Sequence, residues 1–173
     1  CAHFKKVAEV GLPIIAYEVP LRTGISLSIE SAKKILDNIN VIGMKDSSSD
    51  LNLVTELVKS GSKPILCGND VLFQKMIENG ATGGILASAN LFTNLFKEVY
   101  RKNLEGEQVI SKRLFDHLLP FVRLLFQEPN PSPIKWVLTE QKIIATNTVR
   151  LPLTPISTNL MDDLRQILKT IKS

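Results

Sequence analysis

Four short apolar runs recur along the first half of the chain, and each is followed by a polar turn and a segment with helical periodicity. The runs are residues 13–19, 41–45, 64–67 and 84–87. Their apolar character is mostly continuous rather than alternating, which is typical of strands buried on both faces of a parallel sheet. Parallel strands joined by helical crossovers predict an α/β fold.

The segments between these runs carry helix signals. Residues 29–36 place their apolar side chains on one helical face. Asp50 is placed to cap the helix after the second run, and Asp70 is placed to cap the helix after the third. Gly80 is placed to end the helix that follows Asp70. The predicted order is therefore strand and then helix, repeated four times.

From residue 91 onward the pattern predicts only helices. They are expected over residues 91–104, 107–126, 134–141 and 159–171. Residues 128–133 hold three prolines and are expected to form a rigid, irregular loop. We therefore predict two parts, with the βα units in residues 1–104 and a helical subdomain in residues 105–173.

Four βα units amount to half of an eight-stranded (β/α) barrel, which typically needs about 250 residues. An open, doubly wound sheet of four strands is the competing fold, and the pattern alone leaves both open. The chain begins at Cys1, and residues 1–10 already resemble the end of a helix. This beginning suggests a fragment of a longer protein.

Composition argues against several classes of function. The formal net charge is +4 without a dense basic run, so nucleic acid is not an expected partner. No apolar run approaches the roughly 20 residues of a membrane span. His3 and His117 show no metal-ligand spacing, so no metal is expected. Cys1 and Cys67 make no disulfide framework, and Cys67 is expected to be a buried thiol in a reducing, cytoplasmic setting.

Three residues near the ends of the first two runs could carry chemistry. Lys45 ends the second run, at the sheet edge where α/β enzymes place their sites, and a partly buried lysine can act as a nucleophile. The alternative is a lysine that simply reaches into water. Tyr17 ends the first run, where its phenol could transfer protons or merely lie at the surface. Arg22 could hold a carboxylate by two hydrogen bonds, or it could be an ordinary loop arginine.

Five segments resemble, in order and spacing, motifs of the dihydrodipicolinate synthase (4-hydroxy-tetrahydrodipicolinate synthase) family. This family belongs to the superfamily of pyruvate-dependent class I aldolases and N-acetylneuraminate lyases. The segments are residues 17–24 (Y-E-V-P-L-R-T-G), 43–50 (G-M-K-D-S-S-S-D), 83–90 (G-G-I-L-A-S-A-N), 128–136 (E-P-N-P-S-P-I-K-W) and 150–155 (R-L-P-L-T-P). The family patterns are Y-N-V-P-x-R-T-G, G-I-K-E-A-T-G-D, G-V-I-S-V-T-A-N, E-P-N-P-I-P-V-K-W and R-L-P-L-T-P. One such match would be weak, but five in register span essentially the whole chain.

The resemblance implies the C-terminal half of a (β/α)8 TIM barrel followed by a C-terminal helical subdomain. It also implies a cytoplasmic homotetramer built as a dimer of dimers. Lys45 matches the lysine that forms a Schiff base with pyruvate, and Tyr17 matches the proton-relay tyrosine. Arg22 matches the arginine that holds the carboxylate of the second substrate, and Ile85 matches a position that contacts pyruvate.

In this family the enzyme is a lyase that condenses pyruvate with aspartate semialdehyde to 4-hydroxy-tetrahydrodipicolinate. The step belongs to lysine biosynthesis by the diaminopimelate pathway, and no metal or organic cofactor takes part. The chain departs from the family at two places. Glu18 stands where the family usually has Asn and is expected to add a carboxylate beside Tyr17. Residues 47–49, three serines, replace Ala-Thr-Gly, a pattern also found in related aldolases.

Two other functions stay open. A sialate or 2-keto-3-deoxy sugar acid aldolase would use the same lysine and tyrosine, although Arg22 and residues 128–136 favour the synthase. The chain could also be a catalytically silent fragment. The family's first four strands, its pyruvate-carboxylate loop and a tyrosine from a neighbouring subunit have no counterpart in these 173 residues. We therefore expect the chain alone to be inactive.

Overall fold

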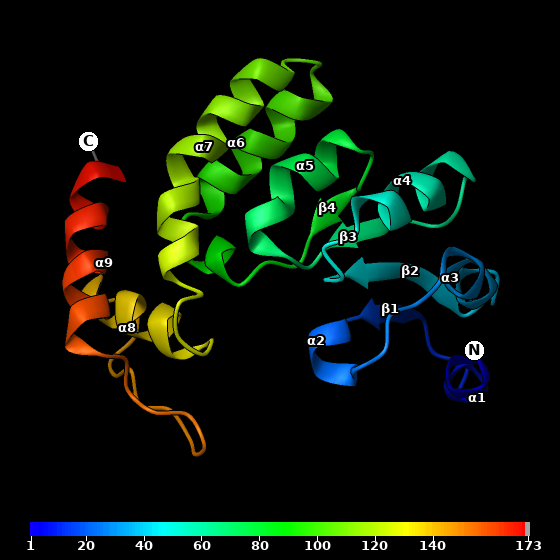
Figure 1. Cartoon of the computed structure of the whole chain (residues 1–173), viewed down its shortest axis with the longest axis horizontal. Helices are drawn as coiled ribbons and strands as arrows, with labels where there is room; N and C mark the ends of the chain where they lie inside the picture. The colour runs from blue at the N-terminus through cyan, green and yellow to red at the C-terminus, as the bar shows by residue number, and fades with distance from the viewer. Residues whose placement is uncertain (172–173) are drawn as a thin grey trace. The chain divides into compact units, whose positions relative to one another are not determined.

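The computed structural model describes residues 1–171, and the chain divides into two compact units, Cys1–Leu86 and the residues from Ala87 onward. The first unit holds a parallel sheet whose strands follow the order of the sequence (Figure 1). The strands are β1 (Ile14–Glu18), β2 (Val41–Asp46), β3 (Ile65–Cys67) and β4 (Gly83–Gly84). A doubly wound sheet reverses its strand order at a switch point, so this sequential order favours a barrel.

Helices alternate with these strands, as the sequence predicted. They are α1 (Ala2–Ala8) before β1, α2 (Pro20–Thr23) and α3 (Ile29–Leu36) after it, α4 (Leu51–Lys59) after β2, and the 3-10 turn η1 (Asp70–Leu72) with α5 (Phe73–Glu78) after β3. α3 packs against β2, and α4 and α5 pack against β3. The sheet residues beneath them, Ala16, Met44 and Ile65, are at most 1% exposed. One face of the sheet is therefore a buried apolar layer.

Two of the three predicted helix signals are confirmed. The Asp50 carboxylate accepts a hydrogen bond from the Asn52 N–H at 2.9 Å and caps α4. Gly80 has a φ of +93° and follows the end of α5. The prediction for Asp70 is wrong, because Asp70 begins a 3-10 turn whose N-cap is Asn69. The inserted turn draws Asp70 inward, where it is 4% exposed.

The fourth strand is shorter than residues 84–87, the predicted run, because only Gly83–Gly84 has strand geometry. The Ile85 N–H still donates to the Cys67 carbonyl oxygen at 2.8 Å. Beyond it the Leu86 side chain lies against Gly84, where a Cβ would stand 3.0 Å from Leu86 Cγ. Residues 85–87 of the predicted run thus continue its apolar pattern without strand geometry.

The second unit is helical. Its elements are the 3-10 turn η2 (Ser88–Asn90), α6 (Thr93–Leu104), α7 (Gln108–Leu124), α8 (Ser132–Glu140) and α9 (Thr158–Ile171). All four predicted helices are confirmed, but α8 begins inside residues 128–133, the predicted loop. Proline is tolerated in a first helical turn, where its missing N–H removes no helical hydrogen bond. Phe121, Leu125, Trp136 and Leu164 lie in the core of this unit, each at most 4% exposed.

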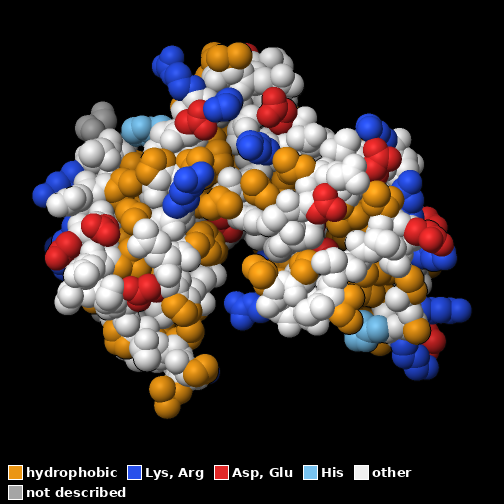
Figure 2. Space-filling model, in the orientation of Figure 1, with side chains coloured by type: hydrophobic (Ala, Val, Ile, Leu, Met, Phe, Trp, Pro, Cys, Tyr) orange, Lys and Arg blue, Asp and Glu red, His pale blue; other side chains and the backbone are white. Residues whose placement is uncertain are grey.

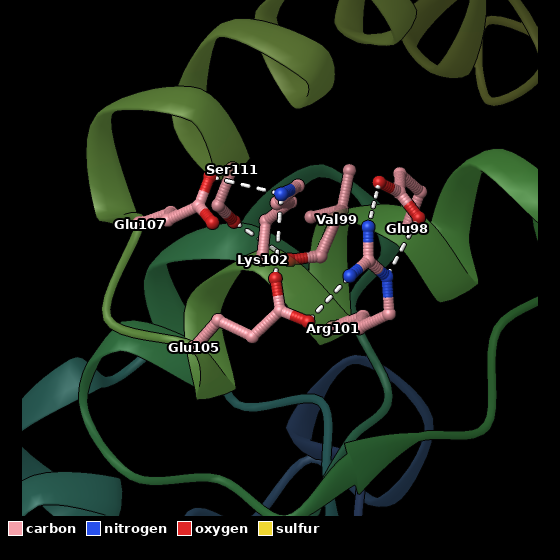
Figure 3. A network of polar contacts seen from close by, with 7 residues as sticks. All are labelled: Glu98, Val99, Arg101, Lys102, Glu105, Glu107 and Ser111. Atoms are coloured by element: carbon pink, nitrogen blue, oxygen red, sulfur yellow. Dashed lines mark hydrogen bonds and ion pairs between the residues drawn. The ribbon is translucent and has the colours of Figure 1, made fainter.

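α6 and α7 pack against each other, and a network of polar contacts joins them near their connection (Figure 3). Its ion pairs are Arg101–Glu98, Arg101–Glu105, Lys102–Glu105 and Lys102–Glu107. Exposed pairs of this kind contribute little, because water screens them. The buried Ser111 hydroxyl donates to the Val99 carbonyl oxygen at 2.8 Å and is the more specific link between the two helices.

The predicted boundary after residue 104 follows the order of the βα units, whereas the two compact units of the structure are defined by contacts within each unit. By sequence order α6 is the helix that follows β4 and completes the fourth βα unit, which ends at residue 104. Compactness divides the chain after Leu86 instead. The boundary at residue 104 stays a prediction.

Charged side chains of both signs are interspersed on the face drawn in Figure 2. Opposite charges that alternate over a surface largely cancel at a distance, so this face presents no extended basic track. Within residues 1–171, no helix combines the length and the apolar character needed to cross a membrane.

Candidate active site

Tyr17 and Lys45 lie side by side at the carboxyl ends of β1 and β2, because the parallel register pairs them directly. Residues paired in this way point to the same face of a sheet. The Lys45 Nζ atom lies over the Tyr17 ring, 4.2 Å from its centroid, in the geometry of a cation–π contact. The structure therefore brings together the two residues that the sequence analysis selected as catalytic.

Gly68, the residue directly after β3, leaves room for the Lys45 side chain. A Cβ at this position would lie 2.6 Å from Lys45 Cε and 2.9 Å from Lys45 Cγ, closer than real Cβ contacts allow. A larger residue would push the lysine away from its place over Tyr17. Sequence reasoning missed Gly68, although a glycine at a strand end often marks the close approach of another group.

Ser47, the first residue after β2, belongs to the same cluster. Its N–H donates to the Glu18 carbonyl oxygen at 2.8 Å, which fixes Ser47 beside the end of β1. Its hydroxyl lies 3.5 Å from the phenolic oxygen of Tyr17. The sequence analysis noted this serine only as a departure from the family motif. The sequence feature that could have pointed to Ser47 is a hydroxyl group two residues after the predicted nucleophile.

Arg22 lies in α2, the single helical turn after β1. Gly24, with a φ of 70°, ends that turn. The Arg22 side chain is exposed, and within residues 1–171 its guanidinium has no hydrogen-bonded or ion-paired partner. The structure therefore does not join Arg22 to Tyr17 or Lys45 by a polar contact. A guanidinium with unpaired donors near the strand ends is available to a carboxylate.

The Glu18 carboxylate does not lie at the Tyr17 phenol, which corrects the expectation from the sequence. Successive residues of a strand point to opposite faces, and Glu18 is 4% exposed whereas Tyr17 is 44% exposed. Glu18 Oε1 accepts a hydrogen bond from the Leu27 N–H at 2.9 Å. The carboxylate therefore holds the returning end of the loop that carries Arg22. This anchoring role was not foreseen.

Ile85 lies just beyond β4, at the same edge of the sheet as Tyr17 and Lys45. The register pairs Lys45 with Leu66 and Leu66 with Gly83, so Ile85 stands two strands away from the lysine. Its side chain is 46% exposed. This position allows contact with a small molecule bound over the strand ends.

Two further buried ionisable residues, Asp46 and Cys67, lie at the same strand ends. Asp46 is 1% exposed, and its Oδ1 accepts from the Ser48 N–H at 2.8 Å. Its Oδ2 is buried and has no hydrogen-bond partner among residues 1–171. Burial is the largest cause that raises the pKa of the Asp46 carboxyl. Cys67 is a buried free thiol, as predicted, and burial raises its pKa to about 12. That thiol stays protonated at neutral pH and is a poor nucleophile.

A pocket of about 450 Å³ opens beside β1 and is bordered by Ile15, Tyr17, Glu18 and Thr23. Of the predicted site residues, Tyr17 borders this pocket, whereas Lys45, Arg22 and Ile85 do not. Within residues 1–171, no three His, Cys, Asp or Glu side chains gather as a metal site would require. The groups able to carry chemistry here are an amine, a phenol and a hydroxyl.

The chain resembles known proteins along nearly all of its length. The family model described as "Dihydrodipicolinate synthetase family" matches residues 1–171. The 4-hydroxy-tetrahydrodipicolinate synthase 2 of Clostridium acetobutylicum is 36% identical over 169 residues, which cover 96% of this chain and 59% of that relative. The 4-hydroxy-tetrahydrodipicolinate synthase of Shigella dysenteriae is 36% identical over 171 residues, with 96% and 58% coverage. The chain therefore spans less than two thirds of the length of these relatives.

Solved structures agree with this assignment. The 4-hydroxy-tetrahydrodipicolinate synthase of Methylacidiphilum fumariolicum SolV superimposes with a TM-score of 0.92 at 30% identity, over 99% of this chain and 58% of that one. A chloride-inhibited dihydrodipicolinate synthase from Acinetobacter baumannii, complexed with pyruvate, gives a TM-score of 0.91 at 34% identity, over 97% and 58%. The sequential parallel sheet and this likeness identify the fold as the C-terminal half of a (β/α)8 barrel with a helical subdomain, and the chain belongs to the dihydrodipicolinate synthetase family.

Proposed function

We propose that this chain carries the Schiff-base lysine of a lyase that condenses pyruvate with aspartate semialdehyde to 4-hydroxy-tetrahydrodipicolinate in lysine biosynthesis. Lys45 is the nucleophile, Tyr17 relays protons, Arg22 holds the carboxylate of the aldehyde substrate, and Ile85 contacts pyruvate. The observation that carries the proposal is the Lys45 Nζ atom 4.2 Å from the Tyr17 ring centroid at adjoining strand ends. Relatives named for this synthase, one of them complexed with pyruvate, support the choice of substrates.

The reaction begins when the neutral Lys45 amine attacks the keto carbon of pyruvate. A C–N bond forms, and the carbonyl oxygen takes the proton that the nitrogen releases. The Tyr17 phenol then protonates the departing hydroxyl, so water leaves and a protonated Schiff base and a phenolate are formed. The phenolate recovers a proton from the pyruvate methyl carbon, which produces an enamine. The enamine carbon attacks the aldehyde carbon of the second substrate and makes the new C–C bond. The aldehyde π electrons move to its oxygen, which takes a proton, and the nitrogen becomes a protonated Schiff base again.

Reductive trapping tests the nucleophile. Borohydride reduces a Schiff base to a stable amine, so pyruvate plus borohydride should label Lys45 in the complete gene product, as located by peptide mass mapping. Lys45→Arg should take no label, whereas Lys59→Ala, at an exposed lysine of α4, should label like the wild type. A label on another lysine, or none, would contradict the assignment.

A sugar acid aldolase is the second candidate, and the observation that favours it is the Ser47 hydroxyl at the site, where the family motif has Ala. Such an enzyme would use the same lysine and tyrosine with a sugar aldehyde instead of aspartate semialdehyde. Turnover with each aldehyde and pyruvate distinguishes the two. A kcat/KM that favours the sugar aldehyde would replace the synthase by the aldolase.

The assembly is proposed as a cytoplasmic homotetramer, a dimer of dimers. Exposed apolar residues such as Leu104 (67%) and Val109 (83%) offer surface for subunit contacts. One solved relative is described as a monomeric dihydrodipicolinate synthase variant. Sedimentation of the complete gene product measures the state, and a monomer at working concentration would contradict the proposal.

A further inference from the structure

The Ser47 hydroxyl lies where the predicted proton relay and the predicted nucleophile meet. Its Oγ atom is 3.5 Å from the phenolic oxygen of Tyr17. A Cβ built on Gly68 would lie 2.3 Å from this Oγ atom and 2.6 Å from Lys45 Cε. The serine hydroxyl and the lysine side chain therefore border the same small space, which Gly68 leaves open.

The backbone holds Ser47 in this place. Its N–H donates to the Glu18 carbonyl oxygen at 2.8 Å, so the serine is tied to the residue that follows Tyr17. Its side chain is half-buried rather than free in water. A hydroxyl fixed in this way reaches the phenolic oxygen by rotation of one side-chain bond, without movement of either strand.

Several charged or titratable groups face Tyr17 from the elements around it. Lys45 reaches it from β2, and His3 of α1 borders the same pocket. Glu18 also borders that pocket, but its Oε1 is engaged by the Leu27 N–H. Within residues 1–171, the hydrogen bond to the phenolic oxygen comes from Ser47.

We propose that Ser47 is a positioning residue for Tyr17, whose phenolate it stabilises by donating a hydrogen bond to the phenolic oxygen. This inference rests on the proposed function, because a phenolate forms only when Tyr17 gives its proton to the departing hydroxyl. The serine keeps its own proton. The phenol proton leaves with water and is replaced from the pyruvate methyl carbon. A separation of 3.5 Å is long for two hydroxyls, and such bonds tighten when substrate binds and charge develops.

The test uses the complete gene product and pyruvate alone in heavy water. Exchange of the pyruvate methyl hydrogens, followed by NMR, measures the rate of enamine formation, and borohydride trapping measures how much Schiff base is present. At pyruvate concentrations well below saturation, Ser47→Ala should lower the trapped amount by roughly tenfold or more, because the phenolate that forms together with the Schiff base loses a hydrogen bond to its charged oxygen, and exchange should slow as well. The family motif has Ala at this position, so this variant should fold.

Two further variants separate positioning from general damage. Ser47→Thr keeps the hydroxyl and should restore both trapping and exchange. Ser48→Ala removes the neighbouring hydroxyl, which accepts from the Asp50 N–H, and should exchange and trap like the wild type. The inference is overturned if Ser47→Ala traps Schiff base within about twofold of the wild type, or if Ser47→Thr restores neither trapping nor exchange. A wild type that traps no pyruvate would defeat the proposed function itself, and this inference with it.

Discussion

The two faces of the sheet differ sharply in exposure. On the face under the helices, Ala16 and Met44 are at most 1% exposed. On the opposite face, Ile15, Tyr17 and Ile85 are 44–46% exposed. The helices of this unit thus cover one face and leave the face that carries the predicted chemistry open.

The same contrast separates neighbouring residues at the strand ends. Tyr17 and Lys45 point to the open face, whereas Glu18 and Asp46, the next residue in each strand, are at most 4% exposed. The open pair consists of an amine and a phenol in contact. The buried pair consists of carboxylates that accept hydrogen bonds from the main chain of the following loops. One step along a strand thus changes a residue's role from chemistry to support.

The largest expected effect concerns the open face as a whole. The 173-residue chain alone should show no condensation activity, because the four strands described within residues 1–171 are too few to close a barrel, and β1 and β4 form the edges of that sheet. Lys45 would also remain more hydrated than in a closed barrel. The assay compares the purified chain with the complete gene product, and light scattering reports its assembly. Activity within about tenfold of the complete protein would show that this half carries a sufficient site, either alone or by pairing with a second copy.

The second largest effect is expected from loss of the Tyr17 phenol. Tyr17→Phe should lower kcat by about 10²–10⁴-fold, the range for removal of a positioned acid or base. Tyr100→Phe, at the other tyrosine of the chain, is the matched control because α6 lies outside the strand ends. Steady-state kinetics with both substrates measures the effect. Similar kcat values for Tyr17→Phe and the wild type would remove Tyr17 from the proton relay.

A smaller and more selective effect is expected at Arg22. Arg22→Ala should weaken use of the aldehyde substrate by about 2–3 kcal/mol in kcat/KM, with pyruvate affected less, because a two-bond carboxylate contact is lost. Arg22→Lys keeps the positive charge but cannot make the two parallel hydrogen bonds of a guanidinium. Its kcat/KM for the aldehyde should fall between the values of the wild type and of Arg22→Ala. Steady-state kinetics in which each substrate is varied in turn gives kcat/KM for the aldehyde and for pyruvate separately. Equal damage to both substrates would mean that Arg22 mainly supports its loop.

Glu18 should act through Arg22 and more weakly. Glu18→Ala removes the acceptor for the Leu27 N–H and should raise the KM of the aldehyde substrate by a few-fold, about 1 kcal/mol for one hydrogen bond. Glu18→Gln keeps a side-chain oxygen and should be nearly silent. In a double-mutant cycle, Glu18→Ala should add little to Arg22→Ala, since both affect the same contact. Additive losses would mean that the buried carboxylate supports something other than the arginine loop.

The places of the strands and the meeting of Tyr17 with Lys45 could be predicted from the sequence. Strands buried in a parallel sheet have continuous apolar runs, and their carboxyl ends meet at one edge. The length of β4 could not be predicted in this way, because the apolar pattern continues past Gly84, where strand geometry ends and the Leu86 side chain lies close to Gly84. A local pattern reports what a residue prefers, whereas strand length depends on what packs over it.

The supporting residues of the site were missed for a related reason. Gly68 matters because Lys45 and Ser47 approach it from the neighbouring strand, a contact with no local signature. Glu18 was expected beside Tyr17 because the two are adjacent in the sequence. The alternation of a strand separates them instead. Motifs thus identify residues that do chemistry more readily than residues that position them.

The smallest expected effect concerns Asp46, one of the buried carboxyl groups at the strand ends, and is an effect on stability. Burial raises the pKa of this carboxyl above its ordinary value of 3.8. Between the ordinary and the raised pKa, the folded protein binds this proton more firmly than the unfolded chain does. Stability is therefore lost as the pH rises through that interval, because the folded carboxyl must ionise without water.

Asp46→Asn removes this titration and keeps an oxygen for the Ser48 N–H. Urea unfolding midpoints of the wild type and the variant, measured from about pH 4 to pH 8, should shift in the variant's favour as the pH rises and then level off. The variant's new N–H donors shift its stability by an amount that does not depend on pH, so only the change in the gap is informative. A constant gap would mean that Asp46 ionises in the folded protein at little cost. Burial of Asp46 would then not raise the free-energy cost of ionising its carboxyl. The contrast between the buried and the exposed face would not extend to the ends of the strands.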